Sequence, residues 1–158
     1  CSRCHYLPIF AGTEGPSFDQ TEFRVTGVPE RGAAPRRLTT DPGRAGAPGV
    51  DPQPSVLHAF KAPTLRNIAW TAPYMHNGAF ATLEEVVAFY DQGAGPGQGY
   101  EVPNLDSVLR QGPLRLSERE KQDLLAFLRD GLTDLSTVPA VPAAVPSGLV
   151  VGGVPRKR

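Results

Sequence analysis

The first five residues read Cys-Ser-Arg-Cys-His, and this run constrains the fold more than any other feature of the chain. In the pattern C-x-x-C-H, each thiol can form a thioether to one porphyrin, and the imidazole that follows can bind its iron. Cys1 and Cys4 are also the only cysteines in the sequence. We therefore predict a covalent haem c, with thioethers at Cys1 and Cys4 and with His5 as the proximal iron ligand.

Other chemistries can use the same two cysteines, namely a disulfide, a redox-active pair or half of a zinc site. A zinc site needs two more ligands at close spacing, whereas His58 and His76 lie far along the chain and are unpaired. A thioredoxin-type pair is typical beside a strand–helix–strand pattern, which this sequence does not show. Haem attachment is therefore the interpretation that the motif favours.

The 158 residues carry a formal net charge of zero and include 17 Gly and 17 Pro. Balanced charge gives no electrostatic reason to expect nucleic acid or a membrane surface as partner. The sequence also has no apolar run of the length that spans a membrane. Because Gly and Pro favour turns, we predict a mainly α, cytochrome c-like haem domain with short helices and long Gly/Pro-rich loops.

Two segments show the periodicity of a helix. One runs from Thr82 to Tyr90, where Thr82 is a suitable N-cap. The other runs from Ser117 to Arg129 and begins with an S-x-x-E capping box. The apolar residues expected to face inward are Leu83, Val86, Val87 and Tyr90 in the first helix and Leu124, Leu125, Phe127 and Leu128 in the second.

The rest of the chain is expected to be mostly irregular. We predict an extended piece at 22–28, a single helical turn at 64–67 and a break at 93–99. Residues 1–135 should form one domain, and the Pro-, Val- and Ala-rich residues 136–158 a disordered tail. Haem is attached to this motif outside the cytoplasm, yet no export signal is visible, so we expect a periplasmic protein whose N-terminal part is missing here.

The second axial ligand is not determined by the motif. A thioether suits an electron-transfer haem, so chemistry alone ranks Met75 first. His76 comes second and Tyr90, at the end of an apolar stripe, third, while His58 is weaker. A mono-haem electron-transfer cytochrome with Met75 as ligand is the alternative that this ranking supports.

Three segments, CSRCH, FKAPTLRNIAWTAPYMHNGAFATLEEVVAFY and LSEREKQDLLAFLRDGL, together resemble the C-terminal haem domain of the bacterial di-haem cytochrome c peroxidase and MauG family. The resemblance covers about residues 1–132 in order. It implies a second, peroxide-reactive haem in a missing N-terminal domain. Hydrogen peroxide would be the oxidant, with a small redox protein as donor or a protein as substrate. The chain alone should then not turn over peroxide efficiently.

The resemblance also changes the ranking of the axial ligands. In the peroxidases a Met in the helix after the His-containing turn binds the second side of the C-terminal haem, and in MauG a Tyr holds that place. The corresponding position, fourteen residues after His76, is Tyr90. The resemblance therefore implies ligation of the iron by Tyr90, with Met75 as the alternative.

Further site residues follow from the family alone. A calcium ion lies between its two haem domains, bound by backbone carbonyls of a Thr-x-Pro segment, and Thr71-Ala72-Pro73 matches that segment. The resemblance thus implies a calcium site at the carbonyls of Thr71 and Pro73. It also implies that Arg66 and His76 contact the haem propionates or the domain interface.

Overall fold

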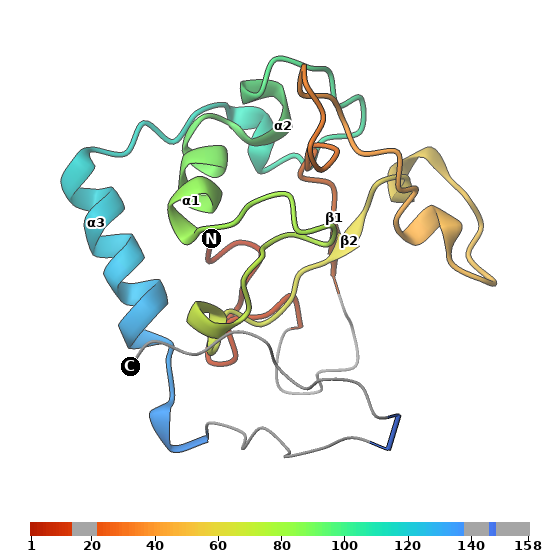
Figure 1. The fold of residues 1–158 in the computed structure, drawn as a ribbon. Helices are drawn as coiled ribbons and strands as arrows, with labels where there is room; N and C mark the ends of the chain where they lie inside the picture. Colours follow the sequence, from red (N-terminus) through yellow and green to blue (C-terminus); the bar gives the residue numbers. More distant parts are fainter. Residues whose placement is uncertain (14–21, 138–145, 148–158) are drawn as a thin grey trace.

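The computed structural model describes residues 1–13, 22–137 and 146–147. Within these ranges the regular structure consists of short helices and one two-stranded ribbon, joined by long loops (Figure 1). Helix α1 (Leu83–Asp91) lies near the centre, α3 (Glu118–Ala126) stands at one side, and α2 (Ala94–Gly97) follows α1 closely. Single turns of 3-10 helix occur at η1 (Arg44–Gly46), η2 (Pro54–Val56), η3 (Ile68–Trp70), η4 (Leu109–Gln111) and η6 (Leu135–Thr137).

Helix α1 begins where the sequence predicts, because Thr82 and Glu85 cap each other. The Thr82 hydroxyl accepts from the Glu85 N–H at 3.2 Å, and the Glu85 carboxylate accepts from the Thr82 N–H at 3.0 Å. After the helix ends, Gly93 adopts a φ of 95°, a left-handed conformation that glycine tolerates best. Local sequence therefore determines both ends of this helix.

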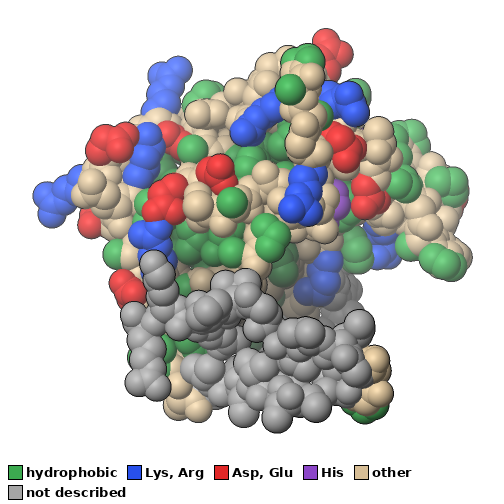
Figure 2. Space-filling model, viewed as in Figure 1, with side chains coloured by type: hydrophobic (Ala, Val, Ile, Leu, Met, Phe, Trp, Pro, Cys, Tyr) green, Lys and Arg blue, Asp and Glu red, His purple; other side chains and the backbone are tan. Residues whose placement is uncertain are grey.

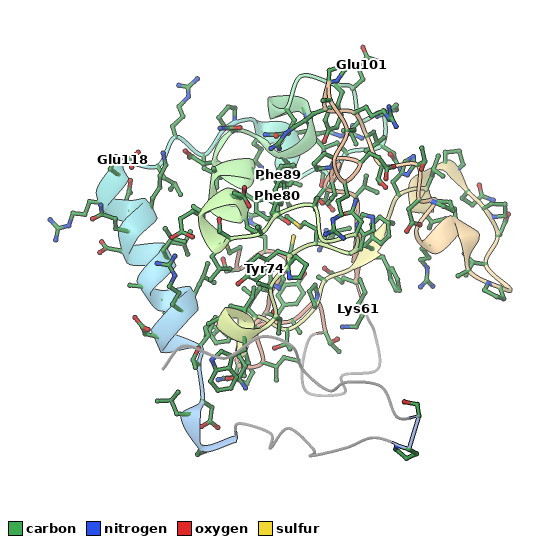
Figure 3. All side chains as sticks on the ribbon, viewed as in Figure 1. Lys61, Tyr74, Phe80, Phe89, Glu101 and Glu118 are labelled. Atoms are coloured by element: carbon green, nitrogen blue, oxygen red, sulfur yellow. The ribbon has the colours of Figure 1, made fainter. Side chains whose placement is uncertain are left out.

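The main core forms around α1. Phe80 and Phe89 are its most deeply buried large side chains, and their ring centroids lie 5.2 Å apart. Figure 3 shows them side by side at α1, with Tyr74 below them. Phe89 lies outside the predicted apolar stripe, which included the half-buried Tyr90 instead. The buried members of this cluster, here called the α1 core, are Tyr74, Phe80, Leu83, Val87, Phe89, Ala94, Leu128 and Leu132.

Helix α3 also starts at its predicted capping box, where the Glu120 carboxylate accepts from the Ser117 N–H at 2.8 Å. The prediction that Phe127 is buried is wrong, since this side chain is 45% exposed. At this point the chain changes into a π-turn, η5 (Phe127–Gly131), in which the Leu132 N–H donates to the Phe127 carbonyl at 3.1 Å. The wider turn directs Leu128 into the α1 core and leaves Phe127 outside it.

The ribbon pairs β1 (Phe23–Arg24) with β2 (Phe60–Lys61) in antiparallel fashion, so the extended segment is shorter than predicted. The N-terminal segment lies beside this ribbon, because the Gly12 N–H donates at 3.0 Å to the carbonyl of Ala62, the residue after β2. A Cβ at position 12 would lie 2.6 Å from the Cβ of Ala62, so only glycine fits this approach. The ribbon therefore connects the cysteine motif to the middle of the chain.

One further prediction is confirmed and one is wrong. The predicted break at 93–99 does interrupt the helical segment, since α1 ends at Asp91 and Gly93 has a left-handed φ, and the break contains one four-residue turn, α2. There Gly95 packs so tightly that a Cβ would lie 2.7 Å from the Gly27 carbonyl. The single turn predicted at 64–67 lies later, at η3, because Asn67 has a φ of 59° and cannot continue a helix. This difference comes from a contact with a distant segment, since the Asn67 N–H donates to the Leu132 carbonyl at 2.8 Å.

Figure 2 shows acidic and basic side chains interspersed over one face, with apolar surface visible between them and on the loop lobe at one side. Of the predicted tail 136–158, most lies outside the described residues, so its disorder stays a prediction. Among the residues described, none of the helices has the length and apolar character needed to cross a bilayer.

Candidate haem site

The cysteine motif forms one helical turn. The backbone N–H groups of Cys4 and His5 donate to the Cys1 carbonyl at 3.0 and 2.9 Å. Neither Cys1 nor Cys4 forms a disulfide, and both thiols are free. Burial raises the pKa of the Cys4 thiol, so this thiol is protonated at neutral pH. The turn therefore places two cysteine side chains and an imidazole on one short segment.

The imidazole of His5 has a defined tautomer. Its Nδ1 lies 2.9 Å from the Pro63 carbonyl and 3.3 Å from the Phe10 carbonyl. A carbonyl oxygen only accepts hydrogen bonds, so Nδ1 carries the proton and Nε2 keeps its lone pair. Burial also lowers the pKa of His5, which favours the neutral ring. A histidine that binds a metal typically donates its other ring N–H to a carbonyl in this way. His5 therefore fits the role of a haem-iron ligand, with Nε2 as the binding atom.

The segment Pro63–Arg66 holds the loop that follows His5. The Thr64 hydroxyl donates to the Ile9 carbonyl at 2.9 Å. Arg66 donates to the Pro8 carbonyl at 2.6 Å, and its guanidinium lies 5.4 Å from the Phe10 ring centroid. Arg66 was predicted to contact a propionate or the domain interface, and the structure places it against this loop.

Tyr90, the predicted distal ligand, lies near the cysteine motif. Burial, with a smaller contribution from the charge of Cys4, raises the pKa of Tyr90 to about 12, and a hydrogen bond with the Thr26 side chain opposes the increase. The phenol is therefore protonated at neutral pH in the chain without metal. A bound ferric ion would have to displace this proton to bind the oxygen as phenolate.

Met75 and His76 are adjacent in sequence but have different surroundings. Met75 has a φ of 70° and packs against the α1 core, as Tyr90 does. The His76 ring instead stacks on Phe60 with centroids 3.6 Å apart, and its Nε2 lies 4.0 Å from the Asp41 carboxylate. His58 belongs to this second group, because its Nδ1 lies 2.7 Å from the Asp41 carbonyl. Among the four candidates, Tyr90 and Met75 therefore share one cluster, and the choice of ligand stays a prediction.

The predicted calcium segment is on the surface. Thr71, Ala72 and Pro73 are all exposed, and the Thr71 hydroxyl donates back to the Ile68 carbonyl at 3.0 Å. In the part of the chain that the structure describes, no three His, Cys, Asp or Glu side chains gather as a metal site. Two backbone carbonyls supply only part of the oxygen shell that calcium takes, so the calcium site stays a prediction.

Two residues at the site were missed by sequence reasoning. Pro63 contributes only its backbone carbonyl, a group that every residue has, so no sequence signal distinguishes it. Thr26, which bonds Tyr90, is 64 positions away in a loop without periodicity. Neither partner can be found without the tertiary fold.

Comparison with known proteins shows which family the chain belongs to. The chain is similar to cytochrome-c peroxidase IdrP1 of Pseudomonas sp. (strain SCT), with 38% identity over 122 residues, which are 77% of this chain and 30% of that protein. It is also similar to methylamine utilization protein MauG of Paracoccus denitrificans (strain Pd 1222), with 31% identity over 153 residues, 85% of this chain and 39% of MauG.

A solved structure agrees with these relatives. The crystal structure of a MauG-like protein associated with microbial copper homeostasis matches with a TM-score of 0.63 and 33% identity, over 86% of this chain and 43% of that one. No family model matches the chain. The chain spans roughly a third of the length of the curated relatives it matches. By sequence and by fold, it belongs to the di-haem cytochrome c peroxidase and MauG family of haem c oxidoreductases.

Proposed function

We propose that the chain is the haem c redox domain of a periplasmic peroxidase-type oxidoreductase. In this proposal it transfers electrons or oxidising equivalents to a peroxide-reactive haem in a part of the protein that this chain does not span. The observation that carries the proposal is the attachment turn, where Cys1 and Cys4, which are not paired in a disulfide, precede a His5 whose Nδ1 donates to the Pro63 carbonyl and leaves Nε2 to bind iron. Family membership supports the same chemistry.

A bound haem c would supply one-electron redox chemistry at its iron. The chain contributes the fixed surroundings of that iron. Cys1 and Cys4 would tether the porphyrin, and the Pro63 carbonyl orients the His5 ring and raises the basicity of Nε2. The buried side chains of the α1 core, Leu83 and Val87 among them, exclude water from this side of the domain.

Tyr90 is the residue that we propose as the second ligand. A phenolate is a hard, anionic donor, so it favours the ferric and higher oxidation states and lowers the reduction potential. A thioether from Met75 would do the reverse. The second candidate function, a mono-haem electron-transfer module, uses Met75, and the packing of Met75 against the same cluster as Tyr90 supports it.

The partners follow from the same proposal. Hydrogen peroxide would be the oxidant, and a small redox protein or residues of a protein substrate would be the electron donor. A calcium ion would bind the carbonyls of Thr71 and Pro73 between two haem domains. The peroxide-reactive haem lies elsewhere in this proposal, so we expect little peroxide turnover from residues 1–158 alone.

The first test is the intact mass of the mature protein isolated from its host. We expect a chain between two and three times this length with two covalent haems. A chain of this length with one haem would instead support the electron-transfer module. The visible spectrum then separates the ligands. Tyr90→Phe should abolish six-coordination of this haem, whereas Met75→Leu and the control Tyr100→Phe should not change it. An unchanged spectrum in Tyr90→Phe would remove Tyr90 from the site.

A further inference from the structure

Arg24, on β1, is a cation placed directly against the attachment turn. Its guanidinium donates to the Tyr6 hydroxyl at 3.3 Å and to the Arg3 carbonyl at 3.4 Å, both of them groups of the turn and its flank. It also forms ion pairs with Glu22 and, at 2.9 Å, with Asp106. Its Nε is buried and has no hydrogen-bond partner among the described residues. One side chain thus connects the turn, the ribbon and the loop before η4.

The carboxylate of Asp106 is held as firmly as the guanidinium. The Asp106 backbone N–H donates to the Val25 carbonyl at 3.0 Å, and the Asp106 Oδ1 accepts from the Val108 N–H at 2.9 Å. The Asp106 side chain is only 11% exposed, and that of Arg24 is 21% exposed. Neither group can move without breaking these contacts, so the pair is a fixed pair of charges beside the turn.

Fixed charges in partly buried surroundings act on nearby redox groups. The Arg24 guanidinium contacts Arg3 and Tyr6, the residues on either side of Cys4 and His5, and the Asp106 carboxylate is ion-paired with that guanidinium. A guanidinium keeps its charge at all ordinary pH values. Charges that are mostly covered are screened much less by salt than exposed ones. A positive charge beside a haem stabilises the reduced iron, and a negative charge stabilises the oxidised iron.

We propose that Arg24 is a positioning residue of the haem site, which holds the attachment turn and, together with Asp106, sets the reduction potential of the attached haem. The inference rests on the proposed function for the presence of that haem. Reduction adds one electron to the ferric iron and therefore removes one unit of positive charge from the site. The two residues bias this step in opposite directions because their charges are opposite.

The test is a spectroelectrochemical titration of the full-length haem protein, with a mediator supplying the electron. Arg24→Gln should shift the midpoint potential of this haem downward, and Asp106→Asn should shift it upward. Lysine keeps the positive charge but lacks the planar guanidinium. The midpoint potential of the haem in Arg24→Lys should therefore lie nearer to the wild-type value than that in Arg24→Gln. A purely structural role predicts shifts of one sign and no such rescue.

The exposed ion pair of α3 gives a matched control. The Arg119 Nε and the Asp123 Oδ2 lie 3.9 Å apart, and the two side chains are 92% and 75% exposed. Arg119→Gln and Asp123→Asn therefore make the same charge changes in solvent. Both should leave the potential unchanged. If Arg24→Gln does not accumulate as a haem protein, Asp106→Asn and Arg24→Lys decide the question. Equal potentials, or shifts of the same sign, overturn the inference. A wild type without covalent haem at Cys1 and Cys4 overturns the proposed function and the inference together.

Discussion

The two sides of the candidate haem site are built by different forces. The attachment side (residues 1–11) is held mostly by hydrogen bonds and charged contacts to distant segments, such as those from His5 to Pro63 and from Arg66 to Pro8. The α1 core is held by close packing of buried apolar side chains, of which Phe80 and Phe89 are the largest. Side chains that face a cofactor must keep defined hydrogen bonds, whereas a supporting core needs only to be filled.

Because of this difference, the α1 core should mainly set the stability of the domain, and the attachment side should mainly set the chemistry of the site. A single hydrogen bond contributes about 1 kcal/mol net, whereas a large buried side chain contributes several times as much. Substitutions in the α1 core should therefore unfold the domain, while substitutions on the attachment side should change local order and the surroundings of the iron. The predictions below test that separation, beginning with the largest effect.

Truncating Phe89 should give the largest loss of stability. Phe89 is 1% exposed and lies against Phe80, so Phe89→Ala should lower the free energy of unfolding by about 3–5 kcal/mol. The matched control is Phe127→Ala, because Phe127 is 45% exposed and its ring lies edge-to-face with that of Phe10, with centroids 5.8 Å apart. Its cost should be about 1 kcal/mol. Urea denaturation followed by circular dichroism measures both, and equal losses would contradict the proposed separation.

A substitution on the attachment side should have a smaller and more local effect on stability. Arg66→Gln removes the hydrogen bond to the Pro8 carbonyl and the contact with the Phe10 ring. We expect a loss of about 1 kcal/mol, so that residues 6–11 exchange their amide hydrogens roughly five times faster. Hydrogen exchange by mass spectrometry measures this, with the exposed Arg119→Gln as control. Faster exchange spread over α1 as well would show that the two sides are not separable.

An effect of similar size that also depends on pH concerns a second cluster of buried residues, Val25, Ala59, Val102 and Leu105, against which Tyr100 packs. Burial raises the pKa of Tyr100 to about 12, and its hydroxyl donates to the Gly27 carbonyl at 2.7 Å. The unfolded phenol ionises near pH 10, so the stability due to this group is complete below pH 10 and is lost as the pH rises towards 12.

The corresponding variant has a simple pH signature. Tyr100→Phe should be less stable than the wild type at pH 8 by about 1 kcal/mol, because one hydrogen bond is lost. The difference should shrink as the pH rises from 10 to 12, since only the wild type has this phenol to ionise. Denaturation at several pH values measures it. A difference that stays constant would mean that Tyr100 does not titrate as its burial requires.

Much of the site could be predicted from residues close together in sequence. The C-x-x-C-H run identifies the thiols and the imidazole, and the capping boxes at Thr82 and Ser117 locate the starts of both longer helices. The predictions that failed, at Phe127 and at the turn of 64–67, concern residues whose conformation depends on distant partners. The π-turn that exposes Phe127 and the hydrogen bond from Asn67 to Leu132 have no signal within their own segments.

The sequence alone therefore identifies the attachment motif and the starts of the helices, because these depend on groups three or four residues apart, while haem attachment itself stays a prediction. The partners that complete the site depend on the folded chain. His5 and Pro63 are 58 positions apart, and Arg24 and Asp106 are 82 positions apart. The physical reason is that a backbone carbonyl or a charged side chain has no preferred partner until the chain folds and brings one within about 3 Å.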